Sequence, residues 1–225
     1  MKTKKDLCIP FGWEERRHVF LDRFFYIPKK YDSAQKGELC DWSSPLIFGR
    51  EAPIWLECCS GNGEWIVERA KAHPEYNWVA VEIRFDRARK IWLRAQAAGL
   101  SNLYVVCAEA SEFLRYYVPK ASIASFFVNF PDPWPKRHHA KHRLIQAPFV
   151  SLVADVLQAT GSITLVTDSE PYRDQMLSEF RLWRSHFPEP FYGSEFASYG
   201  SSFFGTLWTA KGRDIFTLRY QHEMD

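Results

Sequence analysis

The chain has 225 residues, of which 46% are apolar and 25% are charged, and this is the composition of an ordinary globular protein. At this length a single domain with an extra arm is expected rather than two domains. No apolar run approaches the roughly 18 residues of a membrane span, which excludes a transmembrane protein. The net charge of +2 does not by itself demand a nucleic-acid partner, so basic residues have to be sought as local clusters.

The first 50 residues differ in pattern from the rest. An amphipathic helix is predicted over residues 13–25 and a turn-rich stretch over 29–48, so we expect residues 1–50 to form an N-terminal arm outside the sheet. The charged start is followed by too short an apolar stretch for a secretory signal, which predicts a cytoplasmic protein. The five cysteines form no C-x-x-C pair and are expected to be reduced, with no metal site and no disulfide framework.

From residue 54 onward, short apolar runs alternate with amphipathic stretches, which is typical of βαβ units. Strands are predicted over 54–59, 78–83, 103–108, 123–130 and 162–167, and helices over 64–73, 85–98, 111–117, about 142–158, and 171–185. An alternating run over 214–220 predicts a last, antiparallel strand. The pattern indicates a doubly wound, Rossmann-like α/β sheet, mostly parallel, with a C-terminal antiparallel hairpin.

A basic stripe runs along the predicted helix over 85–98. It consists of Arg84, Arg87, Lys90 and Arg94, which recur at helical spacing. Such a stripe is either a solvated face or an RNA-binding surface, and the sequence leaves both open.

A glycine turn, Ser60-Gly61-Asn62-Gly63, follows the first predicted strand of the domain. Glycines there let the backbone approach a ligand at the carboxyl edge of the sheet. A nicotinamide fingerprint would need a third small residue three positions after Gly63, where this chain has Ile66. The turn therefore does not support a dinucleotide ligand.

Three carboxylates stand at the ends of consecutive predicted strands. Glu57 favours a ligand that carries positive charge, such as the sulfonium and ammonium of S-adenosylmethionine. Glu82 is placed to accept both ribose hydroxyls, and Glu109 to accept from the amine of adenine. Singly, each could be a helix cap or a surface charge; together with the glycine turn they predict a site for S-adenosylmethionine.

The fourth predicted strand ends in Pro131-Asp132-Pro133-Trp134. Two prolines stiffen this turn, and we expect the Asp132 carboxylate to be buried between them at the sheet edge. A basic run follows, which is either the solvated start of a helix or a phosphate clamp. Its members are Lys136, Arg137, His138, Lys141 and Arg143.

The phrase NFPDPWPKRHHAKHR resembles the signature of bacterial tRNA (guanine-N7)-methyltransferases, and the likeness runs from about residue 54 to 215, with TDSEPY at 167–172 as a second match. The resemblance implies a class I methyltransferase domain over residues 51–225. It also implies a cytoplasmic monomer or homodimer without metal, which transfers a methyl group from S-adenosylmethionine to N7 of a guanine in the variable loop of tRNA.

The resemblance also implies roles for individual residues. It gives cofactor binding to Glu57, Gly61, Gly63, Glu82, Glu109 and Asp132, catalysis to Asp132, substrate binding to Lys136, Asp168 and Ser202, and RNA binding to Arg137, His138, Lys141 and Arg143. Asp168 could equally be a helix N-cap. The chain departs from the family pattern at Cys59 and Gly205, where the family has glycine and glutamate.

The sequence leaves other functions open. Another class I S-adenosylmethionine-dependent RNA methyltransferase is the nearest alternative. A nicotinamide oxidoreductase would share the fold but needs the missing third glycine, and a non-catalytic RNA-binding protein has no need of three strand-end carboxylates. An amino-methyltransferase would carry a second proline where this chain has Trp134.

Overall fold

The computed structural model describes residues 18–28, 41–42, 44–190 and 203–223. The chain divides into two compact units, residues 1–119 and 120–225, and each is described here by itself. Among the helices within these ranges, none combines the length and the apolarity that crossing a bilayer requires.

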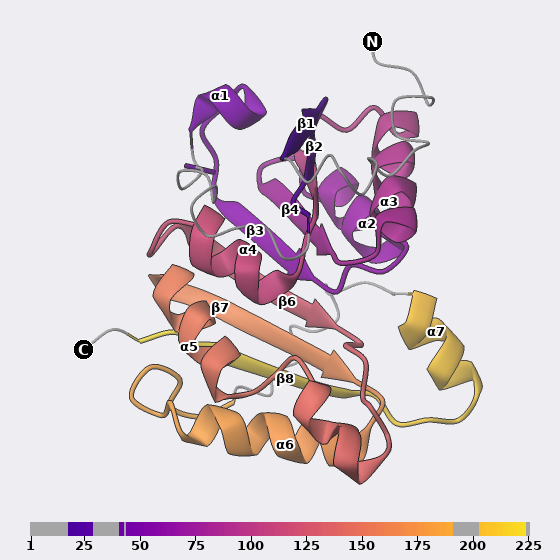
Figure 1. Cartoon of the computed structure of the whole chain (residues 1–225), viewed down its shortest axis with the longest axis vertical. Helices are drawn as coiled ribbons and strands as arrows, with labels where there is room; N and C mark the ends of the chain where they lie inside the picture. The colour runs from indigo at the N-terminus through magenta and orange to yellow at the C-terminus, as the bar shows by residue number, and fades with distance from the viewer. Residues whose placement is uncertain (1–17, 29–40, 43, 191–202, 224–225) are drawn as a thin grey trace. The chain divides into compact units, whose positions relative to one another are not determined.

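Unit 1 contains five strands in the order β1-β2-β5-β4-β3 (Figure 1). β3, β4 and β5 are parallel to one another, β2 is parallel to β5, and β1 is antiparallel to β2. The strands are β1 (Val19–Leu21), β2 (Phe24–Tyr26), β3 (Ile54–Cys58), β4 (Asn77–Glu82) and β5 (Leu103–Cys107). The helices are α1 (Pro45–Phe48), α2 (Glu64–Ala72), α3 (Phe85–Ala97) and α4 (Ala110–Tyr117).

Burial explains why these segments form helices and strands on this sheet. Every residue of β4 is buried, as expected for the central strand of a parallel sheet. α3 packs against β4 and β5 through Ala88, Ile91, Trp92 and Ala95, which recur at helical spacing. Trp42 is 1% exposed and donates a hydrogen bond from its indole to the Tyr117 carbonyl at 2.9 Å.

The predicted helix over residues 13–25 is wrong within the described residues, because β1 and β2 form a hairpin there. Asp22 and Arg23 make its turn with φ values of 28° and 62°, a left-handed conformation without glycine. β2 pairs with β5, so the expectation that residues 1–50 lie outside the sheet is also wrong. The domain boundary at residue 51 stays a prediction.

Unit 2 contains β6 (Ile123–Asn129), β7 (Leu157–Thr167) and β8 (Phe216–Gln221) in that spatial order. β6 and β7 are parallel and β8 is antiparallel to β7, which confirms the predicted mostly parallel sheet with an antiparallel last strand. Its helices are the 3₁₀ helix η3 (Arg137–His142), α5 (Ala147–Val156), α6 (Glu170–Arg181) and α7 (Phe203–Ala210). The predicted helix over 142–158 is shorter than expected, since η3 is a separate turn and β7 begins at Leu157.

Candidate active site

The glycine turn after β3 has a left-handed backbone at three positions. The φ values are 63° at Cys59, 57° at Gly61 and 80° at Gly63. Glycine adopts this region without strain, whereas a side chain at Cys59 brings its Cβ close to the following carbonyl. The departure from the family pattern at Cys59 therefore falls on a position whose geometry favours glycine.

Neighbouring elements fix this turn from several directions. Gly61 donates its backbone N–H to Oε2 of Glu82 at 2.8 Å. A Cβ at Gly63 would lie 2.6 Å from Cγ1 of Ile91 on α3, so only glycine fits there. Arg94 of α3 donates to the Asn62 carbonyl and forms an ion pair with Glu64 at 2.6 Å. Contacts within the protein therefore define the shape of this loop.

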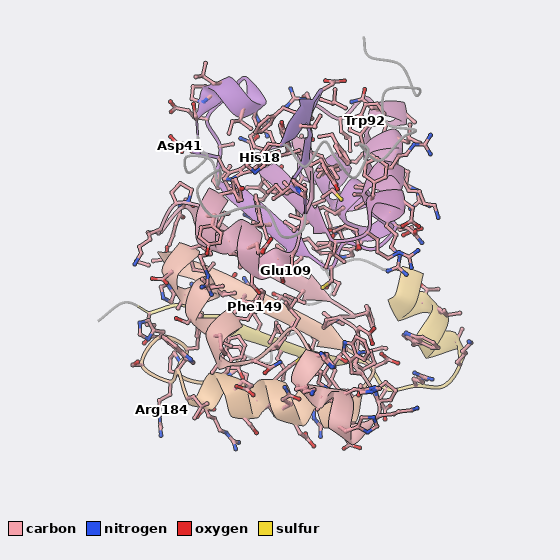
Figure 2. All side chains as sticks on the ribbon, viewed as in Figure 1. His18, Asp41, Trp92, Glu109, Phe149 and Arg184 are labelled. Atoms are coloured by element: carbon pink, nitrogen blue, oxygen red, sulfur yellow. The ribbon has the colours of Figure 1, made fainter. Side chains whose placement is uncertain are left out.

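The three predicted carboxylates gather around the end of β3. Glu57 and Glu82 are 2% and 4% exposed, and Glu109, labelled in Figure 2, is half-buried at the start of α4. The Cys58 thiol reports their proximity: burial raises its pKa well above the usual value, and Cys59, Glu109, Glu57 and Glu82 raise it further. Cys58 therefore stays a neutral, apolar side chain.

Glu82 and Glu109 already hold backbone amides. Glu82 accepts from Gly61 through one oxygen and from Arg84 N–H at 2.9 Å through the other. Burial raises the pKa of Glu82, and the two amides partly oppose this shift. Glu109 caps α4 by accepting from Ser111 at 3.1 Å and Glu112 at 2.8 Å, so the cap interpretation is confirmed for it.

This donor set fits S-adenosylmethionine. Each carboxylate oxygen accepts two hydrogen bonds, so Glu82 and Glu109 keep capacity for ribose hydroxyls or an amine after capping the backbone. The buried carboxyl group of Glu57 suits the cationic end of the ligand. Glu57, Glu82, Glu109 and the Gly61–Gly63 turn are the residues of unit 1 that would hold it.

The turn after β6 presents Asp132 differently from the prediction. Phe130 and Trp134 have φ values of 48° and 41°, and Trp134 donates its N–H to Oδ1 of Asp132 at 3.1 Å. Asp132, Pro133 and Trp134 thus form an Asx turn, and the Asp132 side chain is exposed rather than buried. The expectation of burial is wrong because the carboxylate caps its own turn and points to solvent.

The basic run separates into two kinds of residue. Lys136, His138 and Lys141 are exposed. Arg143 is 8% exposed and donates to the Pro133 carbonyl at 2.7 Å and to Gln175 Oε1 at 2.7 Å, and it lies over the Tyr172 ring. Arg143 therefore ties the Asp132 turn to α6, which favours a structural role for this residue, and its RNA contact stays a prediction. The side chain of Arg137 lies outside the described part of the chain.

Two histidines accompany the Trp134 ring. The centroid distances are 5.6 Å to His139 and 5.2 Å to His142. Sequence reasoning did not single out these two residues, because in a run of basic residues their contact with the tryptophan leaves no signal. Within the described ranges, no group of three His, Cys, Asp or Glu side chains is arranged to hold a metal ion.

Asp168 directly follows β7 and is 10% exposed. It accepts a hydrogen bond from Nη1 of Arg213, a residue that sequence reasoning missed. Ser169, not Asp168, holds the N-cap position of α6, so the cap alternative for Asp168 is wrong. Ser202, the third predicted substrate residue, lies outside the described residues.

The basic stripe of α3 pairs with its own surroundings at two positions. Arg84 donates twice to Asp86, each time at 3.1 Å, and Arg94 holds the glycine turn. These contacts favour the solvated-face interpretation for Arg84 and a structural role for Arg94.

Known proteins resemble this chain over nearly its whole length. A family profile described as "Putative methyltransferase" matches residues 51–217. The tRNA (guanine-N(7)-)-methyltransferase of Chlamydia felis (strain Fe/C-56) is 43% identical, with 96% of each chain covered. The protein of the same name from Chlamydia abortus is 41% identical, again with 96% of each chain covered.

Solved structures support the fold class. The crystal structure of the 16S rRNA methyltransferase KamB superposes with a TM-score of 0.58, covering 83% of this chain and 99% of the other at 16% identity. At that identity the likeness concerns the fold alone, and it confirms the predicted Rossmann-like α/β fold. With near-complete coverage by relatives at about 40% identity, the chain belongs to the tRNA (guanine-N(7)-)-methyltransferase family.

Proposed function

We propose that this protein transfers a methyl group from S-adenosylmethionine to N7 of a guanine in the variable loop of tRNA. The observation that carries the proposal is the glycine turn held by Glu82, with Glu57 and Glu109 close by, in a chain of this family. We expect it to act in the cytoplasm, as a monomer or a homodimer.

The chemistry asks little of the protein at the nucleophile. N7 of guanine carries a lone pair and no proton, so no general base has to act before attack. Bound S-adenosylmethionine supplies the activated methyl group. The protein's task is then to hold the base in line and to offset the positive charge that grows on the purine.

Asp132 is the residue we assign to that task. Its exposed carboxylate can accept from N1 and N2 of guanine while its charge stabilises the cationic product. One of its oxygens already accepts from Trp134 N–H, which orients the group without neutralising it. Lys136, His138 and Lys141 are exposed cations or imidazoles next to it in sequence and are suited to phosphates.

The test is mass spectrometry of nucleosides from unmodified tRNA after incubation with the protein and isotope-labelled S-adenosylmethionine. The expected product is 7-methylguanosine, located to the variable loop by fragment mapping. Label on another base, or on rRNA alone, would replace this function by that of another class I RNA methyltransferase. Transcripts with adenosine in place of the variable-loop guanosine are the matched control and should take no label.

A further inference from the structure

The chain turns back at the end of α7, and this turn places Arg213 over the ring of Trp208. Gly212, with φ 70°, donates to the Thr209 carbonyl at 2.9 Å, and Arg213 donates to the Trp208 carbonyl at 3.0 Å. This pair of bonds is a Schellman closure, in which the residue after the glycine usually makes an apolar contact with the helix. Here the contact is a cation–π one, with Arg213 Cζ 4.1 Å from the Trp208 ring centroid.

Arg213 then reaches the carboxyl end of β7. Its Nη1 donates to Oδ2 of Asp168. The side chain of Asp168 is only 10% exposed, whereas that of Arg213 is 51% exposed. Of the two members of the pair, Arg213 is therefore the one that a large ligand can reach. The hydrogen bond to Asp168 occupies one donor of the guanidinium fork, and phosphate oxygens match the rest.

A second cation shares the tryptophan. Lys211 Nζ lies 4.9 Å from the Trp208 ring centroid, and the side chain is exposed. The two backbone hydrogen bonds of the Schellman closure already cap this helix end, so capping does not explain why two cations lie on one indole ring. Trp208, Lys211 and Arg213 are called the α7 cluster below.

The α7 cluster lies at the same edge of unit 2 as the Asp132 turn. β6 and β7 are parallel, with Asn129 paired to Val166, so the segments that follow them leave the sheet on one side. Figure 1 shows α7 beyond the end toward which the β7 arrow points. Arg143 links this edge further, since it bonds the carbonyls of Pro133 and Pro171.

We propose that the α7 cluster binds RNA phosphates through Arg213 and Lys211, and that Asp168 acts as a positioning residue for Arg213 instead of touching the guanine. This inference rests on the proposed function, because it takes tRNA as the substrate. A carboxylate facing RNA would repel the backbone, whereas one that is shielded behind an arginine fixes the plane of the guanidinium and lets it present its donors.

The test compares full-length Arg213→Ala, Arg213→Lys, Asp168→Asn and the Asp168→Asn/Arg213→Ala double variant. tRNA affinity is measured across a salt series, and methylation kinetics give kcat and KM for tRNA. Arg213→Ala should weaken tRNA binding on the order of tenfold, the loss of one charged hydrogen-bonded contact. It should also lower the slope of log affinity against log salt by roughly 0.7 to 0.9. kcat should stay within about twofold of wild type, because the chemical step is untouched.

The other variants separate positioning from direct contact. Arg213→Lys keeps the point charge and should restore the salt slope. Asp168→Asn should raise KM in the wild-type background and have no further effect once Arg213 is alanine. If Asp168 holds the guanine itself, Asp168→Asn will lower kcat in both backgrounds, and that result would overturn the assignment.

Arg184→Ala is the matched control. It removes one exposed arginine from the same unit, at the end remote from the carboxyl end of β7 in Figure 2, and should change neither affinity nor slope. If the wild type methylates tRNA but the slope of log affinity against log salt is unchanged in Arg213→Ala, phosphate binding by the α7 cluster is refuted and the proposed function stands. A wild type that binds tRNA but leaves guanine unmethylated refutes the proposed function alone. Urea denaturation, followed for each variant beside the wild type, reports whether the variant is folded.

Discussion

The two units carry their functional carboxylates in opposite ways. In unit 1, Glu57 and Glu82 are almost fully buried, and each carboxylate oxygen of Glu82 accepts a hydrogen bond from a backbone N–H group. In unit 2, Asp132 is exposed and holds one amide of its own turn. A small ligand is best met by a rigid, desolvated cradle, whereas a base carried by a large RNA is met by a group that is exposed on a stiff turn. Mutations of these carboxylates should therefore affect folding and cofactor binding together in unit 1, and the rate of methyl transfer alone in unit 2.

Gly63→Ala has the largest expected effect, and it tests whether folding and cofactor affinity change together in unit 1. The new Cβ meets Ile91 Cγ1 at 2.6 Å, at a φ of 80°. We expect a loss of about 2 to 5 kcal/mol in the free energy of unfolding, from the left-handed backbone plus overpacking. Urea denaturation measures it, and S-adenosylhomocysteine affinity should fall in parallel. Gly99→Ala is the control, because that glycine has φ 64° with nothing within 4 Å, so it bears only the backbone term. Equal losses in both variants would contradict the packing argument.

Asp132→Asn tests the opposite behaviour in unit 2. The amide oxygen can still accept from Trp134 N–H, so the turn and the free energy of unfolding should be unchanged. Methyl transfer should slow on the order of a hundredfold, the usual cost of losing one preorganised electrostatic partner. Single-turnover rates at saturating tRNA and donor measure this, with Asp155→Asn as the control. A rate within about threefold of wild type would remove Asp132 from catalysis.

Arg143 and Lys141 allow a buried cation and an exposed cation to be compared within the basic run that follows Asp132. Arg143→Ala removes hydrogen bonds to Pro133 and Gln175 and should lower the free energy of unfolding by about 2 to 3 kcal/mol. Lys141→Ala should leave stability unchanged but lower the salt slope of tRNA binding by roughly 0.7 to 0.9. Denaturation and salt-dependent binding are measured on both. A stable Arg143→Ala variant with a reduced slope would restore Arg143 to the RNA surface.

Glu82→Gln has the smallest expected effect, about 1 to 3 kcal/mol in S-adenosylhomocysteine affinity by calorimetry. A glutamine side chain has one acceptor oxygen, whereas the two carboxylate oxygens of Glu82 accept the backbone N–H groups of Gly61 and Arg84 separately. Glu75→Gln, an exposed change in the same unit, is the control. Undiminished affinity would take Glu82 out of the cofactor site.

The pH dependence follows from the sign of the shift at Glu82. Burial raises its pKa in the folded state above the ordinary 4.5. Its contribution to stability is therefore largest below the unfolded pKa and is lost as the pH rises through the folded pKa. Cofactor affinity should move the other way, falling as the pH drops through the raised pKa, and this fall should be absent in Glu82→Gln.

Sequence reasoning succeeded where a local pattern has one physical cause. Apolar runs predicted β3 to β7, and Gly61 and Gly63 predicted the turn that follows β3. It failed at β1 and β2, because a turn at Asp22-Arg23 lacks the glycine or asparagine that marks hairpins. It could not separate Arg143 from Lys141, because burial of one cation in a basic run depends on distant partners such as Gln175. The pairing of Asp168 with Arg213 was equally invisible, since it joins residues 45 positions apart.

The tryptophans also divide between the units, and this gives the protein intrinsic optical reporters. Trp42, Trp65, Trp78 and Trp92 of unit 1 form a buried set, and Trp134 and Trp208 of unit 2 form a half-buried set beside imidazoles and cations respectively; Trp55 of unit 1 and Trp183 of unit 2 are also half-buried. Denaturation should expose the first set to water and shift its emission to longer wavelength. Binding of RNA would instead change the charges around Trp134 and Trp208, while the emission of the buried tryptophans stays unchanged. One unlabelled fluorescence signal can therefore separate loss of the fold from arrival of RNA.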